Sequence, residues 1–197
     1  MIFAVDVQKE EDPLTWIESP PNLGVMDASE RQQLQNQVVE IGTCLRSIYY
    51  DLMTSERADT TAERLASDIL AHLRASATCI LKRSLGLACW EAHQAAEKSL
   101  KLLSHQKTGS YDHTHELKEL LQKLGDIRVG EDFIKELPTK ERVIRMRANE
   151  GPAVALPEAY KIYRVALPFV RQCAEAMPRK LGIRNARFLL AKAPYVE

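Results

Sequence analysis

The chain has 197 residues, and its 27 Lys and Arg residues are matched by 27 Asp and Glu residues, so the formal net charge at pH 7 is zero. Hydrophobic residues make up 45% of the chain and charged residues 27%, which is typical of a folded globular protein and not of a disordered or fibrous one. Zero net charge excludes a uniformly basic binder of nucleic acid, although it leaves room for a local basic patch.

The first 28 residues predict an irregular arm, separate from the core. The segment MIFAVDV has a strand-like composition, and DPLTWIESPPNLG is rich in proline and turn-forming residues. We expect Trp16 to dock this arm onto the body of the protein.

A long amphipathic helix is predicted over residues 29–53. Its start can be capped either by Ser29 with Gln32 or by Asp27 with Glu30. The apolar residues that follow recur at spacings of three and four, which places them on one stripe: Leu34, Val38, Ile41, Leu45, Ile48 and Leu52. A stripe this regular packs inside a bundle or pairs with a second chain.

Two further helices are predicted over residues 60–104. Thr60 and Glu63 form the expected capping box of the first one. Gly86 marks the expected break between them, because a single unbroken helix would be about 65 Å long. The second helix, over residues 85–104, has small residues on one side that allow close approach of a neighbour: Ala88, Ala92, Ala96 and Ser99.

In the rest of the chain, loops alternate with helices. A short helix is expected over residues 117–124, capped by Asp112 or Thr114, and another over residues 141–147. A last long helix covers residues 158–177, where Pro168 should kink it or end its first half. The body is therefore all-α. The expected domain limits are 1–28 for the N-terminal arm, 29–177 for the helical domain (core about 60–177) and 178–197 for a basic C-terminal tail.

Charge is unevenly distributed along the chain. The first 30 residues contain seven acidic residues and one lysine, whereas residues 171–197 contain six basic and two acidic residues. Neutrality is thus a cancellation between segments, and the acidic arm is suited to fold across a basic surface.

The cellular location is predicted from two features that the sequence lacks. There is no apolar run of about 18 residues and no basic, signal-like N-terminus, so we expect a cytoplasmic protein without a membrane partner. The cysteines are scattered without a C-x-x-C pair, which indicates buried thiols in a reducing compartment: Cys44, Cys79, Cys89 and Cys173.

Common catalytic and cofactor motifs are missing. His113 and His115 lie beside Asp112, but no Cys or carboxylate array completes a zinc site. No G-x-S-x-G, Walker A or G-x-G-x-x-G motif occurs, and the eight glycines are few for a phosphate-loop architecture. The sequence predicts no cofactor, no metal and no catalytic residue of a standard class.

A polar cluster is the remaining candidate site. Glu97, Lys98 and Lys101 share one predicted helix, and Arg145 and Arg147 follow later. Residues 98–147 contain 11 Lys and Arg against eight Asp and Glu. Such cations can bind phosphate by charge-assisted hydrogen bonds. The alternative is a solvated face with a Glu97–Lys101 pair at i, i+4.

Two segments resemble the signature of the HEPN (higher-eukaryote and prokaryote nucleotide-binding) domain. The run ACWEAHQAAEKSLKLL over residues 88–103 is similar to the family's Gln-Ala-x-Glu-Lys helix. The segment DHTHELKELL over residues 112–121 is similar to its His-x-Leu at the start of the next helix. RMRANEG, before the last helix, is similar to the family's arginine-containing turn.

The resemblance implies an up-and-down bundle of four to six helices that forms a homodimer, with polar residues along a groove. On this chain the matching groove residues for nucleotide or phosphate binding are Glu97, Lys98, Lys101, His115, Arg145 and Arg147. One group of the family comprises metal-independent ribonucleases, which use an Arg followed after four to six residues by a His. The other group binds nucleotides or accompanies a nucleotidyltransferase.

The arginine–histidine motif is absent from this chain. No histidine has an arginine four to six residues before it, and no histidine follows Arg145 or Arg147. We therefore expect a non-catalytic module that binds a nucleotide or a protein partner, such as a nucleotidyltransferase. The alternative is a divergent RNA-cleaving member of a toxin-antitoxin or defence system, with a histidine from residues 105–115. A third interpretation is a structural bundle whose 29–53 stripe holds a partner. Whether the chain is an enzyme stays open.

Overall fold

The protein is represented by a computed structural model, which describes residues 13–16, 21–56, 58–125 and 130–178. All regular structure in these ranges is helical, so the predicted all-α bundle is confirmed. The long helices are α1 (Ala28–Met53), α2 (Thr60–Leu81), α3 (Leu85–Thr108) and α7 (Leu156–Glu175). Shorter ones are α4 (Leu117–Lys123), α5 (Glu131–Glu136) and α6 (Lys140–Arg147), with 3-10 turns η1 (Pro13–Trp16) and η2 (Leu23–Val25).

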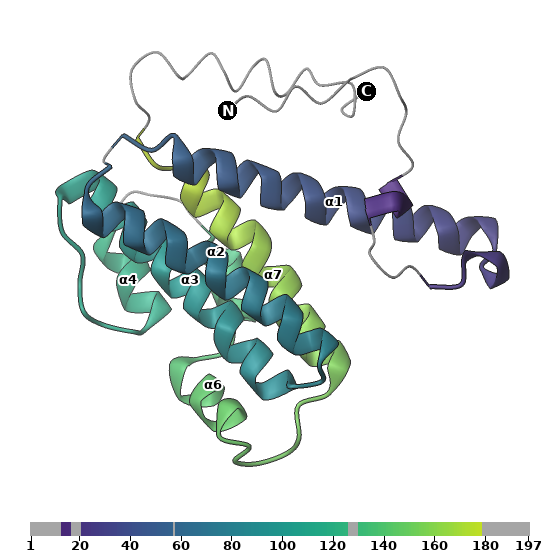
Figure 1. The fold of residues 1–197 in the computed structure, drawn as a ribbon. Coiled ribbons are helices and arrows are strands. Elements are labelled where there is room, and N and C mark those ends of the chain that lie inside the picture. The colour runs from purple at the N-terminus through teal and green to yellow at the C-terminus, as the bar shows by residue number, and fades with distance from the viewer. Residues whose placement is uncertain (1–12, 17–20, 57, 126–129, 179–197) are drawn as a thin grey trace, which may run out of the picture.

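Helix α3 lies at the centre of the bundle. It packs against α2 and α7 over much of its length, and α4 and α6 lie against its remaining sides (Figure 1). Its small residues are fully buried, with Ala92, Ala95, Ala96 and Ser99 all at 0% exposure. Small side chains on several faces let the neighbouring helices approach closely, which is why this helix can be surrounded.

The apolar stripe of α1 belongs to the core of the single chain only in its second half. Ile48 and Leu52 are buried, whereas Leu34 and Val38 are partly exposed. Figure 1 shows the first half of α1 extending beyond the other helices. The C-terminal half of α1 packs against α7, so the apolar stripe there is part of the core of the single chain.

Acidic residues begin both of the first two helices. Asp27 and Glu30 form the capping box of α1, one of the two predicted alternatives. For α2 the predicted Thr60–Glu63 box is wrong, because Asp59 is the N-cap and accepts a hydrogen bond from the Ala62 N–H. An aspartate one position earlier supplies the same acceptor.

Four further local predictions need correction. The N-cap of α4 is Glu116, whose side chain makes no cap hydrogen bond, so neither Asp112 nor Thr114 is the cap. The break between α2 and α3 is the turn 82–84, where Arg83 has a φ of 60°; Gly86 lies inside α3. Helix α3 continues past residue 104 to Thr108, and Gly109 with a φ of 83° ends it. Helix α7 runs through Pro168, which therefore does not end it. Tertiary packing of α7 offsets the lost backbone hydrogen bond.

Several predictions fall outside the described residues. These are the strand-like segment 1–7 and, beyond Pro178, the basic tail; the side chain of Trp16 is likewise not described. The division into arm, helical domain and tail stays a prediction. None of the described helices is long and apolar enough to cross a membrane.

Candidate functional site

The carboxylate of Glu97 is the centre of a polar network on α3. It accepts hydrogen bonds from the Lys101 Nζ atom at 3.0 Å, the His115 Nδ1 atom at 2.9 Å and the Lys140 Nζ atom at 3.4 Å. Its side chain is 1% exposed, and those of Lys101 and Lys140 are 6% and 15% exposed. Three segments, namely α3, the loop before α4 and the start of α6, thus meet at one buried carboxylate.

Glu97 stays ionised in this setting. Burial raises the pKa of its carboxyl, but the hydrogen bonds from Lys101 and His115 and the charges of Lys101 and Lys140 outweigh burial and hold it below its ordinary value. No other acidic partner of Lys101 or Lys140 is found in the described part of the chain. Two ammonium groups therefore share one carboxylate, which leaves an excess of positive charge between α3 and α6.

An aromatic ring adjoins this network. The Lys140 Nζ atom lies 4.3 Å from the centroid of the Trp90 ring, and the Arg147 Cζ atom lies 4.8 Å from it. Both distances are within the range of cation–π attraction. Lys140 thus links the Glu97 carboxylate to Trp90, and α6 provides both of the cations that contact the ring.

Close backbone packing positions α6. A Cβ atom added to Gly86 would lie 2.0 Å from the Met146 carbonyl oxygen, so only glycine allows α3 and α6 to approach this closely. Met146 is the neighbour of both predicted arginines, Arg145 and Arg147. The sequence suggested Gly86 as a helix break; the structure shows it as the contact that places the arginine-bearing turn.

His93 is a second buried polar group on the same helix. Its side chain is fully buried, and neither ring nitrogen has a hydrogen-bond partner among the described residues. Burial lowers the pKa of His93 to about 4, and the Lys140 charge adds to this. The imidazole is therefore neutral at pH 7. It lines a cavity of about 110 Å³ together with residues of α4, α5 and the segment 137–139.

The predicted site residues fall into three groups. Glu97, Lys101 and His115 are brought together, and Arg147 joins them through Trp90 and Lys140. Lys98 lies apart, because its ammonium pairs with Asp68 of α2 at 3.7 Å. Arg145 is exposed and has no ion pair in the part of the chain that is described.

Three contributors were not among the predicted site residues: Trp90, His93 and Lys140. The first two lie seven and four positions before Glu97, on the face of α3 that Glu97 shares, so helical spacing was an available signal. Lys140 is 43 residues from Glu97, and nothing local in the sequence connects the two.

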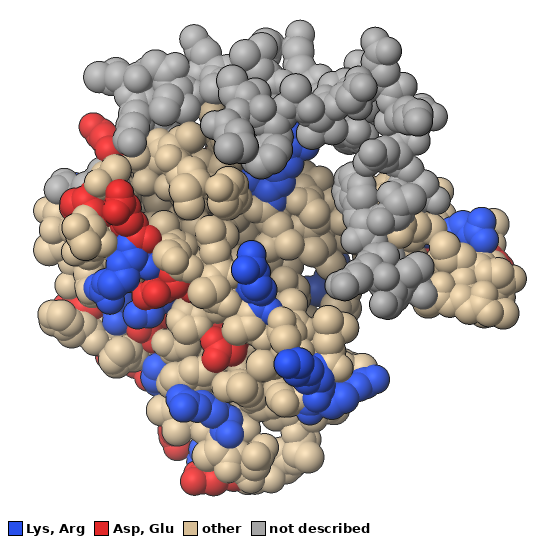
Figure 2. Space-filling view, in the orientation of Figure 1, with Lys and Arg blue, Asp and Glu red and all other residues tan. Residues whose placement is uncertain are grey.

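Positive charge gathers at the end of the bundle that carries α6 and the turn between α2 and α3. Figure 2 shows Lys and Arg side chains over α6 and the α2–α3 turn, at the lower part of the view. The exposed basic residues of these elements are Lys82, Arg83, Arg142, Arg145 and Arg147. Arg142 is neutralised by Glu158 at 2.5 Å. The local basic patch that the neutral composition allowed is therefore present.

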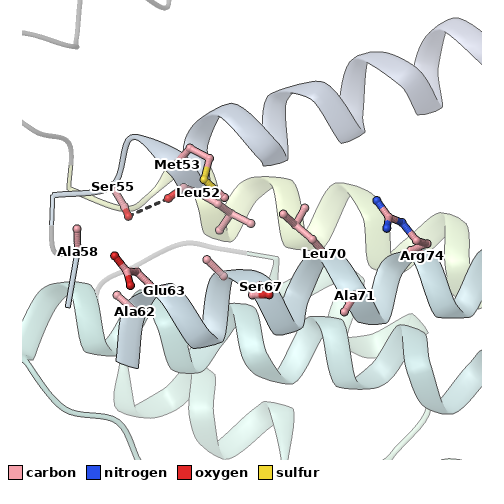
Figure 3. A pocket seen from close by; sticks show the side chains of 11 residues that line it. Leu52, Met53, Ser55, Ala58, Ala62, Glu63, Ser67, Leu70, Ala71 and Arg74 are labelled. Atoms are coloured by element: carbon pink, nitrogen blue, oxygen red, sulfur yellow. Dashed lines mark hydrogen bonds between the residues drawn. The ribbon is translucent and has the colours of Figure 1, made fainter. Parts of the chain in front are cut away.

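A larger cavity lies elsewhere, between the end of α1 and α2 (Figure 3). Its volume is about 480 Å³, and Leu52, Met53 and Leu70 supply its apolar lining. Glu63 and Arg74 are far apart along its α2 side in Figure 3. Because its charged groups do not converge, this cavity has less of the chemistry of a binding site for a charged ligand than the α3–α6 region.

Metal and thiol chemistry find no support in the described ranges. No group of three or more His, Cys, Asp or Glu residues there is placed to hold a metal ion. Burial raises the pKa of Cys44 and of Cys89 to about 11 and that of Cys173 to about 12, so these thiols are not ionised at pH 7.

These features define an all-α bundle in which a polar network around the buried Glu97 carboxylate of the central helix α3 adjoins a basic patch on α6 and the α2–α3 turn. The family model of the HEPN domain matches residues 70–150. The resemblance of this part of the chain to the HEPN family is thereby confirmed. No curated protein and no solved structure gives a significant match. The whole Trp90–Glu97–Lys140 region lies inside the matched residues.

Proposed function

We propose that the HEPN-like domain of this chain is a non-catalytic module that binds a nucleotide between α3 and α6. The observation that carries this proposal is the excess of positive charge there. Lys101 and Lys140 share the single carboxylate of Glu97, although both are nearly buried. Charges held away from water are usually paired, so an unbalanced cation at this place favours binding of an anion.

The phosphate contacts in this proposal come from α6. Arg145 and Arg147 are exposed at its C-terminal end. The Arg147 Cζ atom lies 4.8 Å from the Trp90 ring centroid, and no ion pair of Arg147 is found among the described residues, so its N–H groups can donate to phosphate oxygens. Glu97, Lys101 and His115 hold the surrounding segments in place, and Lys98, which faces α2, has no part in the proposed site.

The non-catalytic part of the proposal rests on the missing motif. No histidine in the chain follows an arginine at the spacing of the family's ribonucleases. His93 lies near the cations but is fully buried, so its ring is inaccessible to a ribose hydroxyl as the structure stands.

Isothermal titration tests the proposal with ATP, GTP and dinucleotides. We expect binding at micromolar to high-micromolar concentration, weakened about tenfold or more in Arg147→Ala and less strongly in Arg145→Ala. Arg46→Ala is the matched control, because it removes an exposed arginine from α1, away from the site. No heat with any of these ligands, or equal losses in the control, contradicts the proposal and leaves a protein partner as the ligand of the module.

A second candidate function is the divergent ribonuclease. The observation that favours it is the pairing of the His115 Nδ1 atom with Glu97, while the His115 side chain is 59% exposed. A carboxylate that orients one ring nitrogen leaves the other available as an acid or base. This function requires metal-independent RNA cleavage that disappears in His115→Ala and in Arg147→Ala. Activity that survives both changes, or that needs Mg²⁺, excludes it.

We also propose that the chain forms a homodimer through the first half of α1. Leu34 and Val38 are partly exposed there, on the part of the helix that extends beyond the bundle. Light scattering of Leu34→Asp with Val38→Asp tests this, and dissociation is the expected result. Ile48 is unsuitable for the same test, because it is buried in the core of the single chain.

A further inference from the structure

The groove between the end of α1 and α2, which holds the larger cavity, has exposed apolar side chains along its borders (Figure 3). Met53 lines it and is 50% exposed, and Tyr49, one turn earlier on the same side of α1, is 56% exposed. On α2, Leu70 lines the groove, and Leu81, three turns further along the same side, is 83% exposed. Large apolar side chains gathered on one surface are typical of an interface with another chain.

The α2 side of the groove is built mainly from small residues. Ala66, Ser67 and Ala71 line it around Leu70, and Ser67 and Ala71 are exposed. Small side chains let the backbone of a second helix approach closely. An apolar groove with such a wall is suited to receive the face of a helix from another chain.

Glu63 and Arg74 mark the two ends of the α2 side of the groove (Figure 3). Both side chains are exposed, and neither has an ion pair in the described ranges. Eleven positions separate them, which is about three helical turns, so they share one side of α2 and lie about 16 Å apart along its axis. An antiparallel second copy of α2 therefore brings the acid of each copy opposite the base of the other, as a two-fold axis requires.

This arrangement of charges also fixes the register of the two helices. When both acid–base pairs form, the two-fold axis crosses α2 midway between them. Leu70 of each copy then lies opposite Ser67 of the other, and Ala66 lies opposite Ala71. Each large side chain meets a small one, so the helices can approach closely in the same register that the charges select.

We propose that the α1–α2 groove receives α2 of a second copy of this chain, antiparallel to the first. This rests on the proposed homodimer and adds a second contact surface to the one on the first half of α1. Glu63 of each copy pairs with Arg74 of the other, and Tyr49 and Met53 flank the incoming helix. Neither α3 nor α6 lines the groove, so this interface is separate from the proposed nucleotide site.

Charge reversal tests the pairing by sedimentation equilibrium of the full chain. Glu63→Arg and Arg74→Glu each place like charges at both symmetry-related contacts, so the dimer dissociation constant should rise about tenfold or more in either variant. The double variant exchanges the two charges and should restore the wild-type value to within about threefold. Glu150→Arg, which reverses an exposed acidic residue on the loop after α6, is the matched control and should leave the constant unchanged.

Mixing the two single variants gives a stricter test of the two-fold arrangement. Glu63→Arg has two basic residues at these positions and Arg74→Glu has two acidic ones, so the mixture has an attractive pair at both contacts. A one-to-one mixture should form a heterodimer with about the wild-type dissociation constant. Ion pairing within a single chain cannot produce this result. Circular dichroism establishes that all variants are folded.

Three results overturn the inference: single charge variants that dimerise like the wild type, a mixture that associates no better than its components, or a wild-type chain that is monomeric at high-micromolar concentration. The last result would also refute the proposed homodimer and leave the groove to a helix of another protein. Dissociation by Leu34→Asp with Val38→Asp, together with unchanged dimerisation of the charge variants, refutes the α2 pairing and leaves the proposed homodimer standing.

Discussion

Replacement of His93 by leucine should stabilise the protein, and more strongly at acidic pH. The variant removes two buried ring nitrogens that have no hydrogen-bond partner among the described residues, and it retains a side chain of similar size. At pH 7, where the imidazole is neutral, the loss of this unsatisfied polarity should raise the free energy of unfolding by about 1 kcal/mol. The substitution also removes a group that resists protonation in the folded state.

The pH dependence follows from the pKa of His93. Burial lowers this pKa from 6.5 to about 4, so the unfolded chain binds more protons than the folded chain between these values. Stability contributed by such a group falls as pH decreases from 6.5 toward 4. With these pKa values the folded state loses about 2 kcal/mol at pH 5, but only about 0.2 kcal/mol at pH 7.

Urea unfolding followed by circular dichroism at pH 7.0 and pH 5.0 measures this difference. The wild-type protein should lose about 2 kcal/mol more than His93→Leu on going to pH 5.0. The other histidines and the carboxylates are common to both proteins, so their contributions cancel in the comparison. An equal loss in the two proteins would refute the assignment of His93 as a buried, neutral imidazole.

Three further variants test the network and the packing. Glu97→Ala leaves the Lys101 and Lys140 ammonium groups without a counter-charge and should lower the free energy of unfolding, measured with urea, by about 3 kcal/mol. A decrease below about 1 kcal/mol would contradict the buried ion pairs of Glu97 with the two lysines. Gly86→Ala places a Cβ atom 2.0 Å from the Met146 carbonyl oxygen, so it should lower the free energy of unfolding by roughly 1–3 kcal/mol and weaken nucleotide binding. An unchanged free energy of unfolding would contradict the close packing of α6 on α3. Ile48→Ala should cost about 3 kcal/mol, whereas Leu34→Ala on the same stripe should cost less than about 1 kcal/mol; similar values for the two would contradict the different burial of the two halves of α1.

Local patterns predicted the long helices well, whereas the short helix α5 was not predicted. The apolar stripe, with either of two capping pairs before it, predicted a helix over 29–53, and the structure has Ala28–Met53. Spacing of i, i+4 also predicted the Glu97–Lys101 pair. These features depend on residues within one or two helical turns of each other, and periodicity is informative at that range.

Relations between distant segments could not be predicted in the same way. Lys140 reaches Glu97 because α6 packs on α3 through the Gly86–Met146 contact, and no sequence pattern encodes that approach. Lys98 shows the converse. It follows Glu97 directly, but one residue is a rotation of about 100° on a helix, which turns it toward α2 and Asp68.

Hydrogen-exchange mass spectrometry with and without ATP tests the location of the proposed site most directly. The nucleotide-binding account predicts slower exchange in α6 and in the segment 111–118, and unchanged exchange around the α1–α2 cavity. Protection confined to residues 52–74, which surround that larger cavity, would contradict the account. So would exchange that is the same throughout the chain at saturating ATP.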